Sequence, residues 1–561
     1  MSGSLPEAQR VWTVGTAPGI FPFVGHGITL FRHPLAFLNS VSKYGDLVEI
    51  RLGPQRAWLV CHPELVHQVL MDARTFDKGG PQYDRLRPLM GNGLVTCAHD
   101  DHRRQRKLIQ PAFHPARITD YARVMGEEAE SVLGVWRPGG TADVSGAMLA
   151  LTTRVTSRFL LSDAMDAETV AELRDCLAAL VRGLFVRTVV PLAPLFRLPT
   201  PANHRYRRAF DRLHAIVDTV IDERRRGRPR DDLLGRLLEA ERGQGGAAAV
   251  TGREIHDQLI TLLLTGVEST AMCLGSLFAL LPAHPEVERR LHAEVDEVLT
   301  EGRPPGPEEL ARLVYTRGVV TETLRVYPPG WLFTRTTTKE TDLAGIRLPK
   351  GVTVLYSPYV LHHDPASFPD PDRFLPERWL SGRPAAARNG ALLPFAAGSR
   401  KCVGDTFAMA EATLAVATVA RRWRLRPLPG HVEQPRPAAT LGPRALEMIC
   451  EPRSQMPPGK PPTQAPATPD KDGAPSEPPS SEPLFSGPRA SQPPSSEPPS
   501  SEPLSSGRLS SQPLPFVPRT EVARIPPGTT ARSPQEFPAN GTAASSPWNR
   551  RREGDKGARG A

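Results

Sequence analysis

The sequence predicts a mainly α-helical catalytic domain with small β-sheets, followed by a disordered C-terminal tail. Three observations lead to this fold class. Long Ala-, Leu- and Arg-rich stretches with helical periodicity fill most of residues 100–325. Short apolar runs bounded by Gly and Pro occur over residues 19–70 and again over 331–360, which is typical of strands. From about residue 451 onward, the chain is dominated by Pro and Ser and has few aromatic residues.

The N-terminal elements are short. Residues 1–15 are expected to form a flexible N-terminus. The runs Leu47–Leu52 and Trp58–Cys61 predict a β-hairpin around Gly53-Pro54. His62-Pro63 then predicts the start of a helix, because proline is well accommodated in the first helical turn.

The longest predicted helix begins after Thr251. Thr251-Gly-Arg-Glu254 has the form of a capping box, in which each side chain satisfies a backbone N–H at the helix start. An apolar stretch follows to about Leu281, where Pro282 and Pro285 end the helix. Further helices are expected over residues 285–300, 308–326 and 405–423.

The C-terminal region cannot build a hydrophobic core. It contains about 25 of the 61 prolines of the chain, and the run Ser476–Leu484 recurs from Ser496. Such a Pro- and Ser-rich composition favours an extended tail over a packed repeat. The sequence therefore predicts one catalytic domain over residues 16–452 and a disordered tail over 453–561.

Composition excludes several functional classes. The net charge of +9 is scattered along the chain and no nucleic-acid motif accompanies it. The N-terminus has no basic region followed by an apolar one, which argues against a secretory signal and a membrane anchor. Sparse cysteines without a Cys-x-x-Cys pair favour a reducing compartment, so we expect a cytoplasmic protein. The six cysteines are Cys61, Cys97, Cys176, Cys273, Cys402 and Cys450.

The most informative run is Phe395-Ala-Ala-Gly-Ser-Arg-Lys-Cys402-Val-Gly404. Cys402 precedes a predicted helix, so backbone N–H groups and the helix dipole favour its thiolate form. A thiolate ligand pushes electron density onto haem iron and favours O–O cleavage. The glycines permit a tight loop close to a flat ligand. A structural cysteine is the better interpretation of an isolated Cys-x-Gly, but here the full Phe-x-x-Gly-x-Arg-x-Cys-x-Gly pattern is present.

This run resembles the haem-binding loop of the cytochrome P450 superfamily, and the chain is similar to its soluble bacterial members. The resemblance covers roughly residues 15–450 and implies the P450 fold. It also implies a heme b cofactor whose iron is bound by the Cys402 thiolate. Arg400 is expected to bind a haem propionate through a charge-assisted hydrogen bond.

Other basic residues match propionate-binding positions of the family. His102 and Arg106 lie four residues apart, so both can point at one carboxylate from the same helix face. An isolated stretch of this kind is more often a solvated helix face. Arg335, which follows the Pro328-Pro-Gly turn, matches a further propionate-binding arginine. The predicted cofactor-binding residues are therefore His102, Arg106, Arg335, Arg400 and Cys402.

Glu322-Thr-Leu-Arg325 has the Glu-x-x-Arg form. On most helices such a pair is exposed and contributes little. In the family, however, this pair and a downstream arginine, here Arg378, form a buried cluster behind the haem. We expect these three residues to fix the loop that carries Cys402.

The segment Thr265-Gly-Val-Glu-Ser-Thr270 resembles the oxygen-activation motif of the family. Splitting dioxygen needs two ordered protons, which an acid beside an alcohol can deliver. Glu268, Ser269 and Thr270 are thus the predicted catalytic residues, with Ser269 and Thr270 competing for the hydroxyl role. Ser269 stands where Thr is usual and Thr265 where a small residue is usual, which puts coupling efficiency in question. A polar kink in a buried helix is the alternative.

The resemblance implies a monooxygenase that inserts one atom of O₂ into an apolar, terpene-like substrate. Ferredoxin and an NAD(P)H-dependent ferredoxin reductase would supply electrons, steered by basic clusters at Arg103/Arg104/Lys107 and Arg400/Lys401. The distal wall is expected to include Trp331–Phe333 and the loop over about 80–96. The alternatives are a peroxygenase and a non-catalytic haem-thiolate protein that binds a ligand or gas.

Overall fold

The computed structural model describes residues 10–162, 164–189, 193–228, 230–243, 250–299, 302–380, 390–430 and 435–453. All of them belong to the first of two units into which the chain divides, Met1–Pro461 and Pro462–Ala561. The predicted tail over 453–561 lies outside the described residues beyond residue 453, and so do residues 1–9 of the predicted flexible N-terminus.

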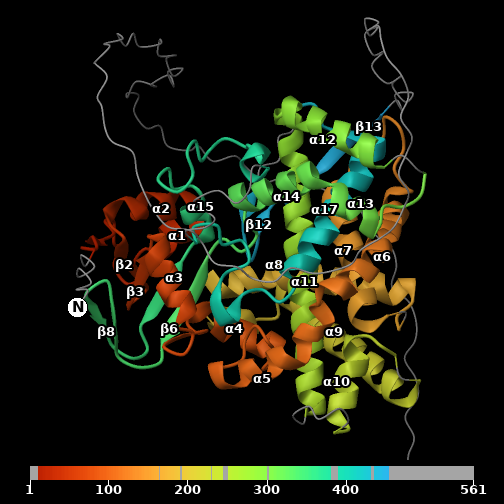
Figure 1. Cartoon of the computed structure of the whole chain (residues 1–561). Coiled ribbons are helices and arrows are strands. Elements are labelled where there is room, and N and C mark those ends of the chain that lie inside the picture. The colour runs from red at the N-terminus through yellow and green to blue at the C-terminus, as the bar shows by residue number, and fades with distance from the viewer. Residues whose placement is uncertain are drawn as a thin grey trace, which may run out of the picture. The chain divides into compact units, whose positions relative to one another are not determined.

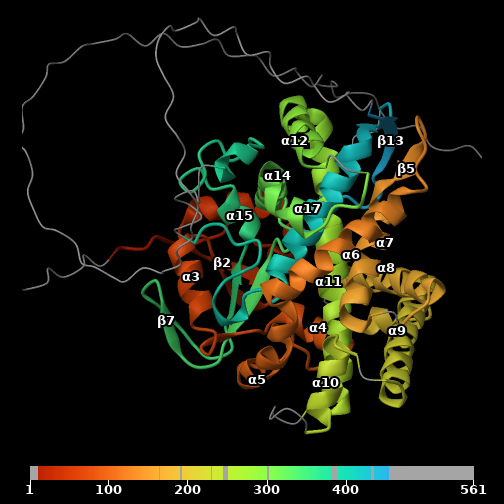
Figure 2. The same cartoon turned by 45° about the vertical axis from the view of Figure 1, so that its right-hand side comes forward.

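Helices form the bulk of the described chain, as predicted (Figure 1). The long helix α11 (Gly252–Leu280) runs through the middle, and α7 (Val144–Leu161) packs closely along it (Figure 2). Helices α14 (Val314–Val326) and α17 (Asp405–Arg422) also contact α11 and each other. Buried Leu, Val and Ala side chains of these helices share one large hydrophobic cluster, which fixes α11 and α17 relative to each other.

The remaining helices surround this core. The α-helices are α1 (Gly27–Arg32), α2 (Pro34–Val41), α3 (Pro63–Met71), α4 (Pro81–Met90), α5 (His99–Ile109), α6 (Pro115–Leu133), α8 (Ala167–Val189), α9 (Pro201–Arg226), α10 (Leu233–Glu241), α12 (Pro285–Val298), α13 (Pro307–Arg312) and α15 (Pro358–His362). The 3₁₀ helices are η1 (Ser42–Tyr44), η2 (Gln110–Phe113), η3 (Ala193–Arg197), η5 (Leu281–Ala283), η6 (Pro376–Trp379) and η7 (Gly398–Arg400).

The sheets are small, as expected. A six-stranded sheet has the order β1 (Val14–Thr16), β2 (Leu47–Leu52), β3 (Gln55–Val60), β9 (Thr353–Tyr356), β6 (Phe333–Thr337), β4 (Phe76–Asp77). A three-stranded sheet has the order β10 (Trp423–Pro427), β13 (Glu447–Pro452), β5 (Thr141–Asp143). Two hairpins complete the set, β7 (Thr341–Leu343) with β8 (Ile346–Leu348), and β11 (Arg436–Pro437) with β12 (Leu441–Gly442).

The local sequence signals are confirmed where they are strongest. Strands β2 and β3 form the predicted antiparallel hairpin. The side chain of His62 accepts a hydrogen bond from the Glu64 N–H at the start of α3. Thr251 and Glu254 form both bonds of the capping box at the start of α11.

The helix predicted over 308–326 is instead two helices that meet at Leu313. The cause is a distant carboxylate. Glu294 of α12 accepts hydrogen bonds from the backbone N–H groups of Tyr315 and Thr316, at 2.6 and 2.7 Å. It therefore caps a new helix start, which local sequence does not reveal.

One stretch among the described residues is long and apolar enough to cross a membrane, Gly252–Ala283, which contains α11. Some 67% of its most apolar window is buried inside the protein. It is thus the central core helix of this fold, and its apolar character is explained by packing.

Candidate active site

The loop before α17 presents Cys402. Gly398 has φ 69°, and a Cβ there would lie 2.4 Å from the Leu70 carbonyl oxygen, so only glycine fits this turn. The Cys402 N–H donates to the Phe395 carbonyl at 2.9 Å, which closes the loop. The predicted pattern therefore has a geometric basis: its glycine makes the turn and its first residue holds the cysteine backbone.

The Cys402 thiol is accessible although it lies deep in the protein. Desolvation by the surrounding protein raises its pKa. The Gly404 N–H and the positive charges of Arg106 and Lys78 act in the opposite direction and favour the thiolate. The start of α17 therefore supplies the expected N–H donor that stabilises the thiolate. In the free thiol, the effect of burial on the pKa is larger than the effect of this donor.

Glu322, Arg325 and Arg378 come together as predicted. Glu322 and Arg325 are fully buried, and two nitrogen atoms of Arg325 donate to the Glu322 carboxylate at 2.8 and 3.0 Å. Arg378 Nε reaches the same carboxylate at 3.4 Å. The Trp379 indole and the Leu375 N–H also donate to it, both at 2.9 Å. One carboxylate thus ties α14 to the segment around η6.

A histidine outside the predicted motifs connects this cluster to the cysteine loop. His362 is fully buried, and burial lowers its pKa to about 3, so its ring is neutral. Its Nδ1 lies 3.0 Å from the Arg325 carbonyl oxygen, and its Nε2 accepts a hydrogen bond from the Leu393 N–H at 2.8 Å. Leu393 lies two residues before Phe395, so His362 anchors the start of the loop.

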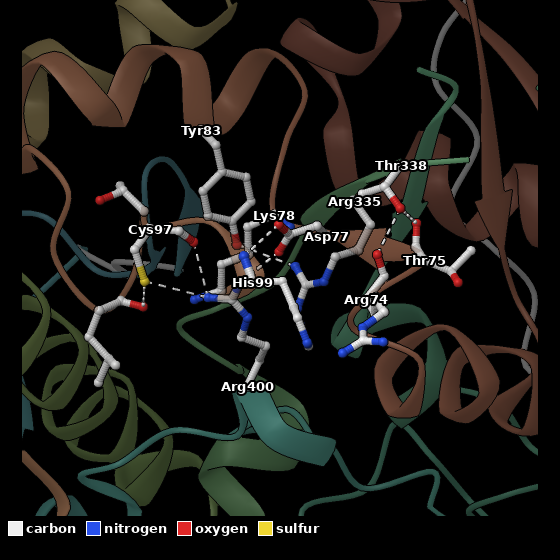
Figure 3. A network of polar contacts seen from close by, with 12 residues as sticks. Arg74, Thr75, Asp77, Lys78, Tyr83, Cys97, His99, Arg335, Thr338 and Arg400 are labelled. Atoms are coloured by element: carbon white, nitrogen blue, oxygen red, sulfur yellow. Dashed lines mark hydrogen bonds and ion pairs between the residues drawn. The ribbon is translucent and has the colours of Figure 1, made fainter. Parts of the chain in front are cut away.

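Several basic side chains gather around Arg400, which belongs to that loop (Figure 3). Arg335 and Arg400 are buried, and Figure 3 shows both beside Lys78 and Asp77. Arg400 forms an ion pair with Asp77 at 2.6 Å. Burial and the charges of Arg335 and Arg400 lower the pKa of Lys78 to about 7. The cluster is therefore rich in positive charge relative to the acid that pairs with it.

Two of the predicted propionate ligands, Arg335 and Arg400, are suited to a further anionic acceptor. The Arg335 guanidinium donates to the Thr334 carbonyl at 2.9 Å and to the phenol oxygens of Tyr83 and Tyr356 at 3.3 and 3.4 Å, all of them neutral acceptors. Arg400 Nε is buried and has no hydrogen-bond partner among the described residues. Such groups are costly to bury unless a further acceptor joins them.

His102 also belongs to this region. It is buried, and burial together with the charges of Arg400, Lys78 and Arg106 lowers its pKa to about 3. Arg106 has a different environment. Its Nη1 donates to the Lys401 and Ser399 carbonyl oxygens at 2.5 and 3.3 Å, so it supports the cysteine loop directly.

The predicted oxygen-activation segment lies within an unbroken part of α11. The Ser269 hydroxyl donates to the Thr265 carbonyl at 2.9 Å, and the Thr265 hydroxyl donates to the Thr261 carbonyl at 2.8 Å. A Cβ on Gly266 would lie 3.2 Å from the Thr156 methyl group of α7. Close packing against α7 is thus a structural reason for glycine at this position.

Glu268 points to a different neighbour from Ser269. Its carboxylate accepts a hydrogen bond from the Thr440 hydroxyl at 2.9 Å. Burial raises the pKa of Glu268, and the Thr440 hydroxyl and the charges of Arg444 and Arg182 partly offset this rise. A raised pKa makes the protonated form of Glu268 easier to reach, which suits a group that donates a proton.

Thr270 is buried and faces α17. The nearby Glu411 of α17 is fully buried, and neither of its carboxyl oxygens has a hydrogen-bond partner among the described residues. Burial raises its pKa well above the usual value, while the Thr270 hydroxyl opposes the rise. Ser269 is only half-buried, so the two competing hydroxyls lie on different faces of α11.

The proposed basic surface clusters are less uniform than the sequence indicates. Arg103 and Lys107 are exposed, and so is Lys401, which forms an ion pair with Asp405. Arg104 instead forms an ion pair with Glu254, and Arg400 is buried among the propionate-site candidates. Arg400 therefore does not belong to an exposed patch, because its charge is already engaged inside.

Of the three residues Trp331–Phe333 expected to line the substrate side of the haem, Trp331 has a different environment. Trp331 is buried, and its indole donates to the Ala438 carbonyl at 3.0 Å. Leu332 and Phe333 are half-buried, and the Phe333 ring stacks on Tyr356 with centroids 5.4 Å apart. Trp331 thus connects the Pro-Pro turn to the hairpin of β11 and β12.

Comparison with known proteins agrees with this geometry. Residues 16–448 match the family model described as cytochrome P450. The chain belongs to the cytochrome P450 family. It is an oxidoreductase of the monooxygenase class, so the predicted fold class and reaction class are confirmed.

Three similar relatives come from Streptomyces. Cyclooctat-9-en-7-ol 5-monooxygenase from Streptomyces melanosporofaciens is 52% identical over 79% of this chain and 96% of the relative. Cyclooctatin synthase from the same organism is 49% identical over 80% of this chain and 97% of the relative. Pentalenene oxygenase from Streptomyces avermitilis is 43% identical, again over 80% of this chain and 97% of the relative.

Membership in this family implies a haem-thiolate iron cofactor, and the residues present fit such a group. The accessible Cys402 thiol supplies a soft anionic ligand for iron. The buried cations and the unpartnered Arg400 Nε fit a ligand that brings two carboxylates. The donor set therefore matches haem on both its iron and its propionate side.

Proposed function

We propose that this P450 is a terpene monooxygenase that uses heme b bound by Cys402. The observation that carries the proposal is the joint placement of the Cys402 loop and the Lys78–Arg335–Arg400 cluster. It is supported by extensive similarity to three bacterial enzymes, each named for a terpene substrate or product. The substrate is then an apolar hydrocarbon skeleton that lacks charged groups for recognition. The shape of the pocket and apolar contacts would then decide which carbon atom of the substrate is oxidised. Such contacts have no preferred direction, so they can position the substrate only by packing closely around it.

We assign the binding of haem to a small set of residues. Cys402 holds the iron, and His102, Arg335 and Arg400 hold the propionates. Arg106 acts on the loop carbonyls beside the cysteine, where it stabilises the loop and favours the thiolate. The Glu322 cluster and His362 keep the loop in place from behind.

When bound, the haem-thiolate supplies the redox chemistry that activates dioxygen. One oxygen atom enters the substrate and the other leaves as water, so the reaction consumes two electrons and two protons. The Ser269 side chain on α11 is half-buried, and we assign its hydroxyl to the proton relay. Glu268 is then the acid that supplies protons to this hydroxyl. Thr270 faces Glu411 and remains its competitor.

The proposal includes separate redox proteins as the source of electrons for the haem. We propose an acidic ferredoxin, served by an NAD(P)H-dependent reductase, that docks near Arg103, Lys107 and Lys401. These exposed cations lie on α5 and on the loop that carries Cys402. Opposite charges would accelerate the encounter, and this acceleration would weaken with added salt. A cytoplasmic location fits such soluble partners.

A peroxygenase or a ligand-binding haem protein would share the Cys402 loop. The deciding experiment supplies ferredoxin, reductase and NADPH with a panel of cyclic terpenes. The proposal expects NADPH consumption that depends on substrate and a product with one added oxygen. Product formed with hydrogen peroxide alone at the same rate would favour the peroxygenase, and no product on any route would favour the binding protein.

A further inference from the structure

The hairpin of β11 and β12 contacts two parts of the proposed active site at once. On one side, the Thr440 hydroxyl donates to Glu268 Oε1 at 2.9 Å. On the other, the Ala438 carbonyl accepts a hydrogen bond from the Trp331 indole at 3.0 Å. A single residue, Ala439, therefore separates the residue that contacts the Pro-Pro turn from the residue that contacts α11.

The hairpin is held firmly between these elements. The Leu441 N–H donates to the Pro329 carbonyl at 3.0 Å, and the Ala438 N–H donates to the Thr440 carbonyl at 3.0 Å. A Cβ on Gly442 would lie 2.8 Å from the Met272 side chain of α11. Because there is so little space, a shift of the Pro-Pro turn must move Thr440 relative to Glu268 or strain these contacts.

The surroundings of Glu268 leave Thr440 as its closest partner. The carboxyl group is faced by the Thr440 hydroxyl, by Arg182 of α8 and by Arg444 after β12. Both arginines are exposed, so solvent screens their charges. The Ser269 hydroxyl donates to the Thr265 carbonyl, so the acid and the alcohol are held by different partners.

We propose that Thr440 is the positioning residue of Glu268 and that the hairpin transmits movement of the Pro-Pro turn to this acid. The inference rests on the proposed role of Glu268 in proton delivery. Leu332 and Phe333 follow Trp331 directly and are candidates for contact with the substrate. A substrate that presses on this segment therefore acts on the acid through Trp331, Ala438 and Thr440.

The primary test compares Thr440→Val with Thr440→Ser in the full-length holoenzyme. Valine keeps the shape and removes the donor, whereas serine keeps the donor. Loss of one hydrogen bond corresponds to a factor of about 2–10, so the ratio of product to peroxide should fall about 2- to 10-fold in Thr440→Val. Thr440→Ser should behave as the parent enzyme, and the substrate dissociation constant should not change in either variant.

Two further readouts separate positioning from a general structural role. The infrared carboxyl band assigned by Glu268→Gln should titrate at higher pH in Thr440→Val, because a donor that lowers the pKa is lost. In the Glu268→Gln background, Thr440→Val should have no added effect on coupling. Trp331→Phe removes the indole donor and should lower coupling in the same direction.

The outcomes distinguish the inference from the function on which it rests. If Glu268→Gln leaves coupling and its solvent isotope effect unchanged, the proposed role of the acid is wrong. If Glu268→Gln uncouples the enzyme but Thr440→Val does not, only the positioning role is overturned. Equal effects of Thr440→Val in both backgrounds would also overturn it, since the threonine would then act independently of the acid.

Discussion

Replacing Glu322 by Gln should destabilise the protein by several kcal/mol and loosen its haem. Glu322 is fully buried and accepts five hydrogen bonds, two from Arg325 and one each from Arg378, Leu375 and Trp379. A glutamine has one acceptor oxygen, and its NH₂ group faces donors. It also leaves the buried Arg325 without an opposite charge.

Removal of one partner from a buried ion pair typically costs about 3–5 kcal/mol. That is a large part of the total stability of about 5–15 kcal/mol expected for a folded domain. The measurement is urea unfolding of the parent and Glu322→Gln proteins, followed by circular dichroism and by haem absorbance. The haem should also leave the variant faster, because His362 and the loop start at Leu393 depend on the same cluster.

Glu308→Gln is the matched control. Glu308 is 82% exposed and pairs with Arg303 at 3.4 Å, so its loss should cost less than about 1 kcal/mol. A Glu322→Gln protein as stable as this control, with unchanged haem retention, would refute the reasoning that the buried cluster holds the cysteine loop.

Further predictions concern the haem, the proton relay and the tail. Cys402→Ser should abolish the thiolate signature of the reduced CO complex and all monooxygenation, because a hydroxyl is far less acidic than a thiol; a normal thiolate spectrum in this variant would contradict the assignment. Lys78 has a pKa lowered to about 7, so propionates should raise it and haem uptake should consume a proton. Haem affinity should then fall as the pH rises above about 7, and Lys78→Met should flatten that profile; an equally steep profile in the variant would exclude Lys78. Ser269→Ala should raise peroxide release more than Thr270→Ala, and the reverse order would assign the relay to Thr270. Deleting residues 456–561 should leave the CO spectrum intact, since Pro- and Ser-rich segments pack little; loss of haem would move the domain boundary.

The parts of the fold that sequence could predict are those with local causes. Thr251 and Glu254 cap a helix within four residues, and His62-Pro63 starts one by itself. The Cys402 loop also has a local cause. Its ten-residue run contains both the glycine that makes the turn and the cysteine that precedes the helix. A helix start that is fixed by a side chain from another helix cannot be predicted in this way. Glu294 lies about 20 residues before the helix that it caps, and nothing local marks that contact.

The same distinction applies to the site. Glu322, Arg325 and Arg378 were predictable because their pattern resembles that of a known family. His362 and Thr440 were missed, because their importance lies in single contacts to distant segments. The functional environment of Lys78 and Glu411 is even harder to predict from the sequence. A lone Lys or Glu is usually solvated, and only the packed structure shows that these two sit beside other charges or without a partner.

The proposed reaction of this P450 is the transfer of one atom of dioxygen to a terpene skeleton. The most direct measurement is turnover of a cyclic terpene under isotopically labelled dioxygen, with NADPH, ferredoxin and reductase, followed by mass spectrometry of the product. We expect one labelled oxygen atom per product molecule and no product when either NADPH or dioxygen is omitted. A product that carries oxygen from water, or one that forms without NADPH, would contradict it.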